Sequence, residues 1–493
     1  MSSGTAAQRA TDAVETYANF IDGVWQPAAN GKTVDVVSPS DGEVFAQIAR
    51  GCAEDVDHAV VAARRAFEEG EWGKRTATDR GRLLSKIGLL ILDRSEELAQ
   101  LEARDTGKPM TQARADMTAA ARYFEYYGAA ADKVHGDTIP FLSGYSVTTI
   151  QEPHGVTGHI IPWNYPAQMF GRTLAPALAM GNATVLKPAE EACLTSLRLV
   201  ALASEAGLPK GALNVVTGLG EEAGAALSAH PDIDFLAFTG SPEVGTLIQK
   251  AAAEHHIGCV LELGGKSPQI IFADADLDAA LPVVLKAIVQ NGGQTCSAGS
   301  RVLIESQIYN DVVAWLTPRF AELTAGPHHA DLDCGALISA RQAERVKGFI
   351  ERAAAAGLPP IARGKVAEGS PDAGFYVAPA LFNGVPEDHE LAREEVFGPV
   401  LTCLTFDDEA DAIRLANDTD YGLVAGIWTR DGARQMRVAN KIKVGQVFIN
   451  GYGAGGGIEL PFGGVKRSGH GREKGFEALL EFSATKTLVF NHG

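Results

Sequence analysis

Residues 156 to 261 alternate between short apolar runs and longer segments in which apolar residues recur at helical spacing. Strands that alternate with helices in this way form a parallel, doubly wound sheet. Such sheets bind ligands at the carboxyl ends of their strands. The pattern predicts strands at 157–161, 183–186, 213–216, 235–238 and 259–261, and helices at 166–180, 194–205, 221–229 and 242–253.

The alternation restarts after Gly265, which indicates a second α/β unit. We expect the Gly265 turn to be the hinge between the two units, with Glu262 and Cys296 near the cleft. The second unit is predicted to have strands at 269–272, 302–305, 400–406, 423–429 and 446–449, and helices at 277–289, 307–323, 341–355 and 432–441.

Segments outside these alternations complete the expected fold. Residues 17–50 are typical of short strands and turns, and Asp55 is a candidate cap for a helix that ends near Glu69. Two alternating runs, at 146–152 and 484–490, predict a small separate sheet. We interpret this sheet as a piece that pairs with another subunit, and ordinary edge strands are the alternative. Further helices are predicted at 80–92, 95–106 and 111–130.

Charge and hydropathy exclude two classes of partner. The net charge is −18 and the chain contains no block of Lys or Arg. Nucleic acid is therefore not expected as a partner, because its binding depends on neutralising phosphates. No apolar run is long enough to span a bilayer, so no membrane partner is expected either.

Cysteine usage and the first residues predict a cytoplasmic protein. The six cysteines include no CxxC pair, which favours free thiols in a reducing compartment. Met1–Thr16 is polar and lacks the apolar core of a secretory signal, so we expect a frayed tail there. The pairs His255-His256 and His328-His329 have no further ligands at metal spacing, and we expect no metal.

Three residues together predict a reacting centre. Cys296 lies among small residues, and Glu262 ends an apolar run directly before the Gly264-Gly265 turn. A thiol nucleophile and a carboxylate base are the parts that covalent carbonyl chemistry needs. Asn164, between two prolines, is a neutral amide donor that could stabilise an oxyanion. A cysteine taken alone is more often a buried structural residue, so this assignment depends on the surrounding pattern.

Three stretches are typical of a dinucleotide site. Gly240-Ser241 joins a strand to a helix, where backbone N–H groups suit a pyrophosphate, although a plain strand–helix turn is the alternative. Lys187 and Glu190 follow another strand and could hydrogen-bond ribose hydroxyls. A carboxylate there repels a 2′-phosphate, which favours NAD over NADP. Glu395 and Phe397 offer a carboxylate and an aromatic face for a nicotinamide ribose and ring.

Seven motifs occur in one order along the chain: Pro162-Trp163-Asn164-Tyr165-Pro166, Lys187-Pro188-Ala189-Glu190, Phe238-Thr239-Gly240-Ser241, Glu262-Leu263-Gly264-Gly265-Lys266, Gly293-Gln294-Thr295-Cys296, Glu395-Val396-Phe397-Gly398-Pro399 and Pro461-Phe462-Gly463-Gly464. With them the sequence resembles the aldehyde dehydrogenase superfamily over essentially its full length. The resemblance implies a Rossmann-like NAD-binding domain at 1–130 and 151–262, a catalytic domain at 263–478, and an oligomerisation piece at 131–150 and 479–493. It also implies a homodimer or homotetramer.

The resemblance assigns roles to the residues above. The Cys296 thiolate attacks the aldehyde, Asn164 and the Cys296 N–H hold the oxyanion, and hydride leaves to the nicotinamide. Glu262 then activates the water that hydrolyses the thioester. A CoA-acylating relative lacks a carboxylate at the position of Glu262, so hydrolysis is favoured. The cofactor residues implied by the resemblance are Ile161, Pro162, Trp163, Lys187, Glu190, Gly220, Phe238, Gly240, Ser241, Leu263, Glu395 and Phe397.

The expected substrate is a medium-sized aldehyde, with a distal carboxylate or polar group as an option. In succinate-semialdehyde-type relatives an Arg at the position of Arg172 binds the substrate carboxylate, but Gln290 replaces the second Arg of that clamp. A structural ion pair is the other interpretation of Arg172. Many relatives have a relay Lys, linked to a Glu matching Glu473, where this chain has Thr173, and a water chain could substitute. The predicted pocket residues are Tyr165, Met169, Phe170, Arg172, Gln290 and Phe462.

Three alternative functions are weighed against an NAD-dependent enzyme. The first is an NADP-preferring semialdehyde dehydrogenase with Arg172 as the carboxylate anchor. The second is a protein that kept the fold without activity, which the presence of Cys296, Glu262 and Asn164 opposes. The third is a cysteine hydrolase, which needs a His base, and no His lies near Cys296 in the sequence.

Overall fold

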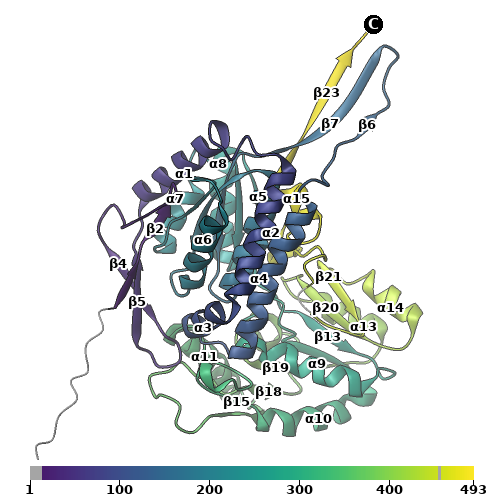
Figure 1. The fold of residues 1–493 in the computed structure, drawn as a ribbon. Helices are drawn as coiled ribbons and strands as arrows, with labels where there is room; N and C mark the ends of the chain where they lie inside the picture. The colour runs from purple at the N-terminus through teal and green to yellow at the C-terminus, as the bar shows by residue number, and fades with distance from the viewer. Residues whose placement is uncertain (1–13, 454–456) are drawn as a thin grey trace, which may run out of the picture.

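The computed structural model describes residues 14–453 and 457–493. In this part of the chain two α/β units are joined, and a narrow three-stranded sheet projects from them (Figure 1). The predicted fold class, two α/β units with a small β piece, is confirmed. Every helix of the described residues is too short or too polar to cross a bilayer.

The first unit is built on an eight-stranded sheet with the order β22-β12-β11-β8-β9-β10-β2-β3. Its five middle strands are parallel: β12 (Gly258–Glu262), β11 (Phe235–Thr239), β8 (Val156–Ile161), β9 (Ala183–Pro188) and β10 (Leu213–Val215). Antiparallel strands close both sides, namely β2 (Asn19–Ile21), β3 (Val24–Gln26) and, from the far end of the chain, β22 (Gly469–His470).

The helices of this unit follow the predicted alternation with one exception. They are α5 (Pro166–Met180), α6 (Leu194–Ala206), α7 (Ala225–Ser228) and α8 (Pro242–His255). The exception is the helix predicted at 221–229, which is present but begins as a π-helical turn at Gly220–Gly224 before it continues as α7.

Four helices precede these in the chain: α1 (Ala53–Glu68), α2 (Ala77–Asp93), α3 (Ser95–Thr106) and α4 (Met110–Ala130). The first packs on the sheet, and the other three pack on α5 and α6. The prediction that Asp55 caps α1 is wrong, because Asp55 is the third residue of the helix. Its carboxylate accepts the backbone N–H of the true cap, Cys52, at 2.9 Å. α4 packs closely on α5, since a Cβ on Gly171 would lie 3.0 Å from the carbonyl oxygen of Ala120.

The second unit has a seven-stranded sheet with the order β16-β18-β19-β14-β13-β20-β21. The strands are β13 (Pro268–Ile271), β14 (Arg301–Glu305), β16 (Ala362–Arg363), β18 (Ala380–Phe382), β19 (Val400–Phe406), β20 (Val424–Trp428) and β21 (Gln446–Ile449). The main helices are α9 (Leu277–Val289), α10 (Tyr309–Glu322), α11 (Ala340–Ala355), α13 (Glu409–Asn417) and α14 (Gly432–Ala439). The short strands β16 and β18 and the helix α13 were not predicted.

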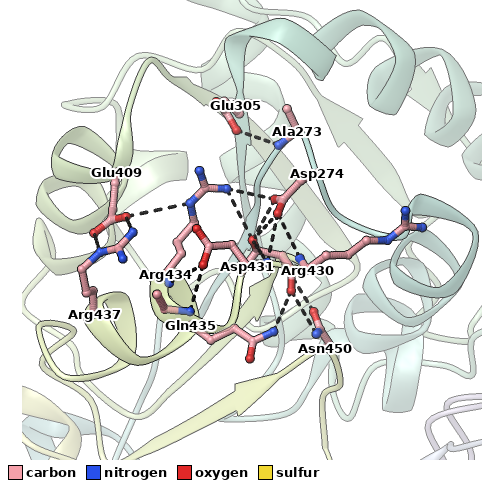
Figure 2. A network of polar contacts seen from close by, with 12 residues as sticks. Ala273, Asp274, Glu305, Glu409, Arg430, Asp431, Arg434, Gln435, Arg437 and Asn450 are labelled. Atoms are coloured by element: carbon pink, nitrogen blue, oxygen red, sulfur yellow. Dashed lines mark hydrogen bonds and ion pairs between the residues drawn. The ribbon is translucent and has the colours of Figure 1, made fainter.

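A polar network fixes one end of this second sheet (Figure 2). Asp274, just after β13, accepts a hydrogen bond from the Thr429 hydroxyl at 2.7 Å and from the backbone N–H of Asp431 at 3.1 Å. Arg434 of α14 donates to the same carboxylate at 3.0 Å and stacks on the ring of Phe272. The network ties the ends of β13 and β20 to α14.

The projecting sheet combines the two alternating runs seen in the sequence. It consists of β6 (Thr138–Ile139), β7 (Tyr145–Pro153) and β23 (Ser483–Asn491), with β23 antiparallel to β7 over its whole length. The sheet extends away from the body of the molecule (Figure 1). Its strands and the β6–β7 connection expose large apolar side chains, namely Ile139, Phe141, Leu142, Val489 and Phe490.

The beginning of the chain departs from the prediction. The tail predicted at Met1–Thr16 is wrong at its end, because Glu15 and Thr16 belong to β1 (Glu15–Tyr17). This strand pairs with β5 (Val44–Ala49), which also pairs with β4 (Thr33–Val37). Residues 1–13 lie outside the described part of the chain.

Candidate active site

The nucleophile loop follows α9 through a tight turn at Gln290–Gly293. Asn291, Gly292 and Gly293 have positive φ angles of 52°, 61° and 74°. A Cβ on Gly293 would lie 2.1 Å from the carbonyl oxygen of Gly398, so only glycine allows this approach. The turn presents Cys296 half-buried at the junction of the two units.

The hinge turn and the nucleophile loop touch each other. A Cβ on Gly265 would lie 2.3 Å from the carbonyl oxygen of Cys296. Glu262 is the last residue of β12, three residues before this contact, and its side chain is 2 % exposed. The structure therefore brings the predicted thiol and carboxylate to one place.

Asn164 lies between β8 and α5 and reaches the same loop. Its Nδ2 donates to the carbonyl oxygen of Gln294 at 2.9 Å, and its own carbonyl accepts from Asn291 Nδ2 at 3.0 Å. An amide nitrogen carries two hydrogens, so the bond to Gln294 leaves one for a ligand oxygen. Asn164 is thus held beside Cys296 as an oxyanion donor would be.

Two buried carboxylates flank Arg172 on α5. Arg172 Nη2 donates to Glu262 Oε2 at 3.1 Å, and its Nε pairs with Oε2 of Glu473. Burial raises the pKa of Glu262 to about 8; the Glu473 carboxylate adds to the rise, and the Arg172 guanidinium opposes it. Of the two interpretations of Arg172, the buried ion pair is the one that the structure contains.

Thr173, next to Arg172, contacts a different group. Its hydroxyl hydrogen-bonds His159 Nδ1 at 2.6 Å, and His159 Nε2 bonds the hydroxyl of Thr157 at 2.8 Å. Burial lowers the pKa of His159 to about 3, so this imidazole is neutral. Thr173 is therefore tied to β8 rather than to Glu262.

The surroundings of the Cys296 thiol disfavour its ionisation. Burial raises its pKa to about 12, and Arg172 is the strongest of the groups that oppose the rise. Lys474 acts in the same direction, whereas Glu262 adds to the rise. The cation on α5 thus faces both the thiol and the carboxylate.

The predicted pocket residues lie in two different environments. The Tyr165 hydroxyl bonds the Thr295 hydroxyl at 2.8 Å and accepts from Gln290 Nε2 at 3.3 Å, so both predicted residues adjoin the nucleophile loop. Phe462 packs in a small apolar cluster against Cys296. Met169, which was also predicted to line the pocket, is buried, with 5 % of its surface exposed. Phe170 lies in the core against Phe124 and not at an entrance, because it points from α5 toward α4.

The predicted adenosine-side residues contact one another. Lys187 Nζ donates to Glu190 Oε2 at 2.6 Å, and the other Glu190 oxygen accepts the Gly220 N–H at 3.2 Å. Burial would raise the pKa of Glu190, but the Lys187 ammonium outweighs it and the pKa lies below its usual value. A Cβ on Gly220 would meet no atom within 4 Å, so open space adjoins this donor–acceptor pair. The pair fits the two hydroxyls of a ribose.

The predicted pyrophosphate turn is narrow and polar. Ser241 caps α8, with its hydroxyl accepting the Val244 N–H at 3.3 Å. A Cβ on Gly240 would lie 2.5 Å from the ring of Phe238, so glycine keeps the backbone open to a ligand. A Cβ on Gly245 would lie 2.6 Å from Leu263, which packs α8 against the end of β12.

The nicotinamide-side residues come from the second unit. Glu395 Oε1 accepts the Gly265 N–H at 2.9 Å, and burial raises its pKa to about 7. Phe397 meets the indole of Trp163 edge-on at 5.4 Å. Ile161 and Pro162 precede Trp163 at the carboxyl end of β8, where a doubly wound sheet binds its ligand.

Comparison with known proteins decides the family. The model described as the aldehyde dehydrogenase family matches residues 25–488. The chain belongs to the aldehyde dehydrogenase family. Aldehyde dehydrogenase family 2 member C4 of Arabidopsis thaliana is 42 % identical over 477 residues, which cover 95 % of this chain and 94 % of the relative.

Solved structures agree with this result. A protein of Burkholderia cenocepacia described as a candidate aldehyde dehydrogenase is 62 % identical, with a TM-score of 0.96 and coverage of 97 % of this chain and 100 % of that chain. The NAD⁺ complex of an aldehyde dehydrogenase from Bacillus cereus is 42 % identical, with a TM-score of 0.94 and coverage of 97 % of both chains.

One cluster that supports the site of this aldehyde dehydrogenase was not predicted from the sequence. The buried Lys108 ammonium donates to Asp116 at 2.5 Å, to Glu102 at 3.1 Å and to the carbonyl oxygen of Asn164 at 3.0 Å. Burial would lower the pKa of Lys108, but the two carboxylates outweigh it and hold the pKa above its usual value. Lys108 stands in a Gly-Lys-Pro turn, where no periodic pattern marks it as buried.

A second missed residue is Tyr452. Its hydroxyl donates to the carbonyl oxygen of Ser297 at 2.6 Å and so fixes the loop just after Cys296.

No group of three or more His, Cys, Asp or Glu side chains placed to bind a metal occurs within residues 14–453 and 457–493.

Proposed function

We propose that this aldehyde dehydrogenase oxidises an aldehyde to the carboxylic acid with NAD and water, without CoA. The observation that carries the proposal is the contact between the Gly265 turn and Cys296, which places Glu262 and the thiol together. An overall turnover converts aldehyde, NAD⁺ and water into acid, NADH and a proton.

The first half of the reaction uses Cys296 and Asn164. The thiol loses its proton to solvent, and Arg172 and Lys474 favour the resulting thiolate. The thiolate adds to the carbonyl carbon, and the oxygen, now negative, accepts a hydrogen bond from Asn164 Nδ2. NAD, when bound, accepts the hydride that leaves this carbon, which becomes a thioester on Cys296.

The second half uses Glu262. A water gives its proton to the unprotonated carboxylate and adds to the thioester carbon. The carbon–sulfur bond then breaks, which releases the acid and restores the Cys296 thiolate. A carboxylate base buried beside the thioester makes water the acceptor of the acyl group, so CoA is not required.

The dinucleotide would be held along the carboxyl edge of the first sheet. Lys187 and Glu190 would bind the adenosine ribose, Ser241 the pyrophosphate and Glu395 the nicotinamide ribose. The Glu190 carboxylate supports NAD over NADP, because it would repel a 2′-phosphate. NAD⁺ in the complex of the Bacillus cereus enzyme also supports this choice. An NADP-preferring enzyme remains the alternative, and parallel assays with both dinucleotides distinguish the two.

The substrate is proposed to be a medium-sized aldehyde without a required carboxylate. Arg172 is already paired with two protein carboxylates, which removes support for the anchor role that a semialdehyde enzyme needs. Relatives about equally similar to this chain are named for different aldehydes, namely benzaldehyde, retinal and betaine aldehyde. Overall identity therefore does not select one of them.

We also propose a homodimer or homotetramer in the cytoplasm. The exposed apolar side chains of the projecting sheet, such as Phe141 and Phe490, support pairing with a second copy. Light scattering of Phe490→Glu should then show a shift toward monomer.

Six free thiols, all within the described residues, support a reducing compartment, which cell fractionation would test.

The test of the reaction is NADH formation at 340 nm by wild type and Cys296→Ala, with neutral aliphatic, aromatic and ω-carboxylated aldehydes. Wild type should produce NADH and stoichiometric acid, and the variant should produce none. NADH from Cys296→Ala would contradict the thioester route. Turnover that depends on added CoA would contradict the role of Glu262.

A further inference from the structure

Arg172 joins the two carboxylates beside the reacting centre. Its Nη2 bonds Glu262 at 3.1 Å and its Nε pairs with Glu473. The guanidinium is 4 % exposed and lies 4.4 Å from the centre of the Phe462 ring. It projects from α5, a helix whose residues are almost all buried. The cation is therefore fixed in place and committed to the protein's own carboxylates.

Glu262 is held through one oxygen only. Oε2 receives the Arg172 bond, whereas Oε1 is buried and has no hydrogen-bond partner among the described residues. A buried carboxylate oxygen without a donor is costly, so it calls for an explanation. A base needs one free lone pair, and Oε1 supplies it while Oε2 fixes the orientation of the group.

We propose that Arg172 is a positioning residue, which holds Oε2 of Glu262 so that Oε1 stays directed at the water that attacks the thioester. The proposal rests on the proposed function, because it needs Glu262 as the base. In the assisted step a proton passes from water to Oε1, the water oxygen bonds the acyl carbon, and sulfur leaves as the Cys296 thiolate. Arg172 takes no proton in this step.

The arrangement predicts the direction of a pH effect. Glu262 accepts a proton only when unprotonated, so hydrolysis rises as pH rises through its pKa, about 8. Loss of the guanidinium leaves burial and Glu473, which both raise that pKa, so the midpoint moves to higher pH. The charged and titratable groups that interact with Glu262 or with its two partners are Tyr123, Tyr127, Arg172, Cys296, Arg472, Glu473 and Lys474.

The experiment uses hydrolysis of p-nitrophenyl acetate by the full chain, which needs no dinucleotide. The burst of p-nitrophenol reports acylation of Cys296, and the steady rate reports hydrolysis of the acyl-enzyme. Arg172→Gln should keep a burst of about one per subunit, slow the steady rate by about 10- to 100-fold, and move the pH midpoint upward. Arg172→Lys keeps the charge without the fork, and its midpoint should lie between those of Arg172→Gln and wild type.

Arg80→Gln is the matched control. Arg80 donates to the carbonyl oxygen of Ala179 at 2.9 Å, at the far end of α5. The Arg80→Gln variant therefore removes an arginine contact from the same helix without affecting Glu262. Its pH midpoint should equal that of wild type. If Arg80→Gln moves the midpoint as Arg172→Gln does, the effect is structural and the proposal is overturned.

Other outcomes separate this proposal from the reaction itself. An unmoved midpoint in both Arg172 variants overturns the positioning role, provided that Glu262→Gln still stops after its burst. A burst that persists in Cys296→Ala overturns the proposed function instead. A rise in KM confined to ω-carboxylated aldehydes in Arg172→Lys, with an unmoved midpoint, would assign the guanidinium to the substrate. If Arg172→Gln does not fold, Arg172→Lys alone decides between these results.

Discussion

Two buried clusters adjoin the site, and each places one cation between two carboxylates. Lys108 lies between Glu102 and Asp116, and Arg172 lies between Glu262 and Glu473. Their charge counts are identical, yet their hydrogen bonding differs. Lys108 spends all three of its donors on the protein, one of them on the Asn164 backbone.

Each cluster contains a carboxylate oxygen without a hydrogen-bond partner among the described residues. In the Lys108 cluster both oxygens of Asp116 have donors, since Gln112 and Gln168 bond Oδ1 at 2.7 and 2.8 Å and Lys108 bonds Oδ2, but Glu102 Oε2 has none. In the Arg172 cluster Glu262 Oε1 has none. The comparison teaches that neither the charge count nor an oxygen without a donor distinguishes a structural cluster from a reacting one. The position of the carboxylate does, because Glu262 lies three residues before the Gly265 turn that contacts Cys296.

The largest expected effect is that of Glu262→Gln. The amide keeps an oxygen for the Arg172 bond but cannot accept a proton from water. Turnover should fall by about 10²- to 10⁴-fold, while the first burst of NADH is retained. Stopped-flow absorbance measures both phases, and mass spectrometry should find the acyl group on Cys296. An equal loss of burst and turnover would contradict the division between the clusters.

Lys108→Met should act on stability instead. It leaves Glu102 and Asp116 buried without their cation, which costs about 3–5 kcal/mol of unfolding free energy. Urea unfolding measures the loss, and Lys133→Met, at an exposed lysine, is the control. The folded protein should keep the wild-type pH midpoint of acyl-enzyme hydrolysis. A stable Lys108→Met variant with a shifted midpoint would move Lys108 into the reacting cluster.

Asn164→Ala tests the point where the two clusters meet. Lys108 holds the backbone of Asn164, whereas the Asn164 side chain donates to the carbonyl oxygen of Gln294, so the variant should lose this bond together with the oxyanion donor. We expect kcat/KM to fall by about 10²- to 10³-fold, and the unfolding free energy to fall by about 1 kcal/mol. A fall of less than tenfold would remove Asn164 from the chemistry and leave it a structural residue.

Thr173→Val should have the smallest effect. It removes one hydrogen bond to neutral His159, which costs about 1 kcal/mol of unfolding free energy. Because Thr173 is tied to β8 and not to Glu262, the pH midpoint of acyl-enzyme hydrolysis should stay where it is in wild type. A shift would show that the His159 pair takes part in proton transfer.

Local patterns made most of the fold predictable. The strand at 446–449 and the helices at 166–180 and 277–289 have the predicted bounds, because each has a clear period and a clear end. β16 and α13 were missed because a two-residue strand and a nine-residue helix leave weak patterns. The site residues were found through their motifs, which mark positions but give no contacts.

Contacts between residues far apart in the chain are the part of the site that the sequence could not predict. Arg172 and Glu473 are 301 positions apart, and nothing in either segment indicates that their charges meet. Lys108 similarly reaches Asn164 across 56 positions. Because the sequence does not show these contacts, both interpretations of Arg172 stayed open until the structure identified its partners.

The antiparallel strand β22 has a consequence for synthesis on the ribosome. It completes the edge of β12, yet Gly469 follows Glu262 by 207 residues. At roughly 5–20 residues per second, β12 waits about 10 to 40 s with an unpaired edge. Unpaired edges are templates for aggregation. The nascent first half therefore has an open edge along β12, and a stalled or truncated chain leaves unpaired the end of the strand, Leu261 and Glu262, that β22 pairs with in the finished protein.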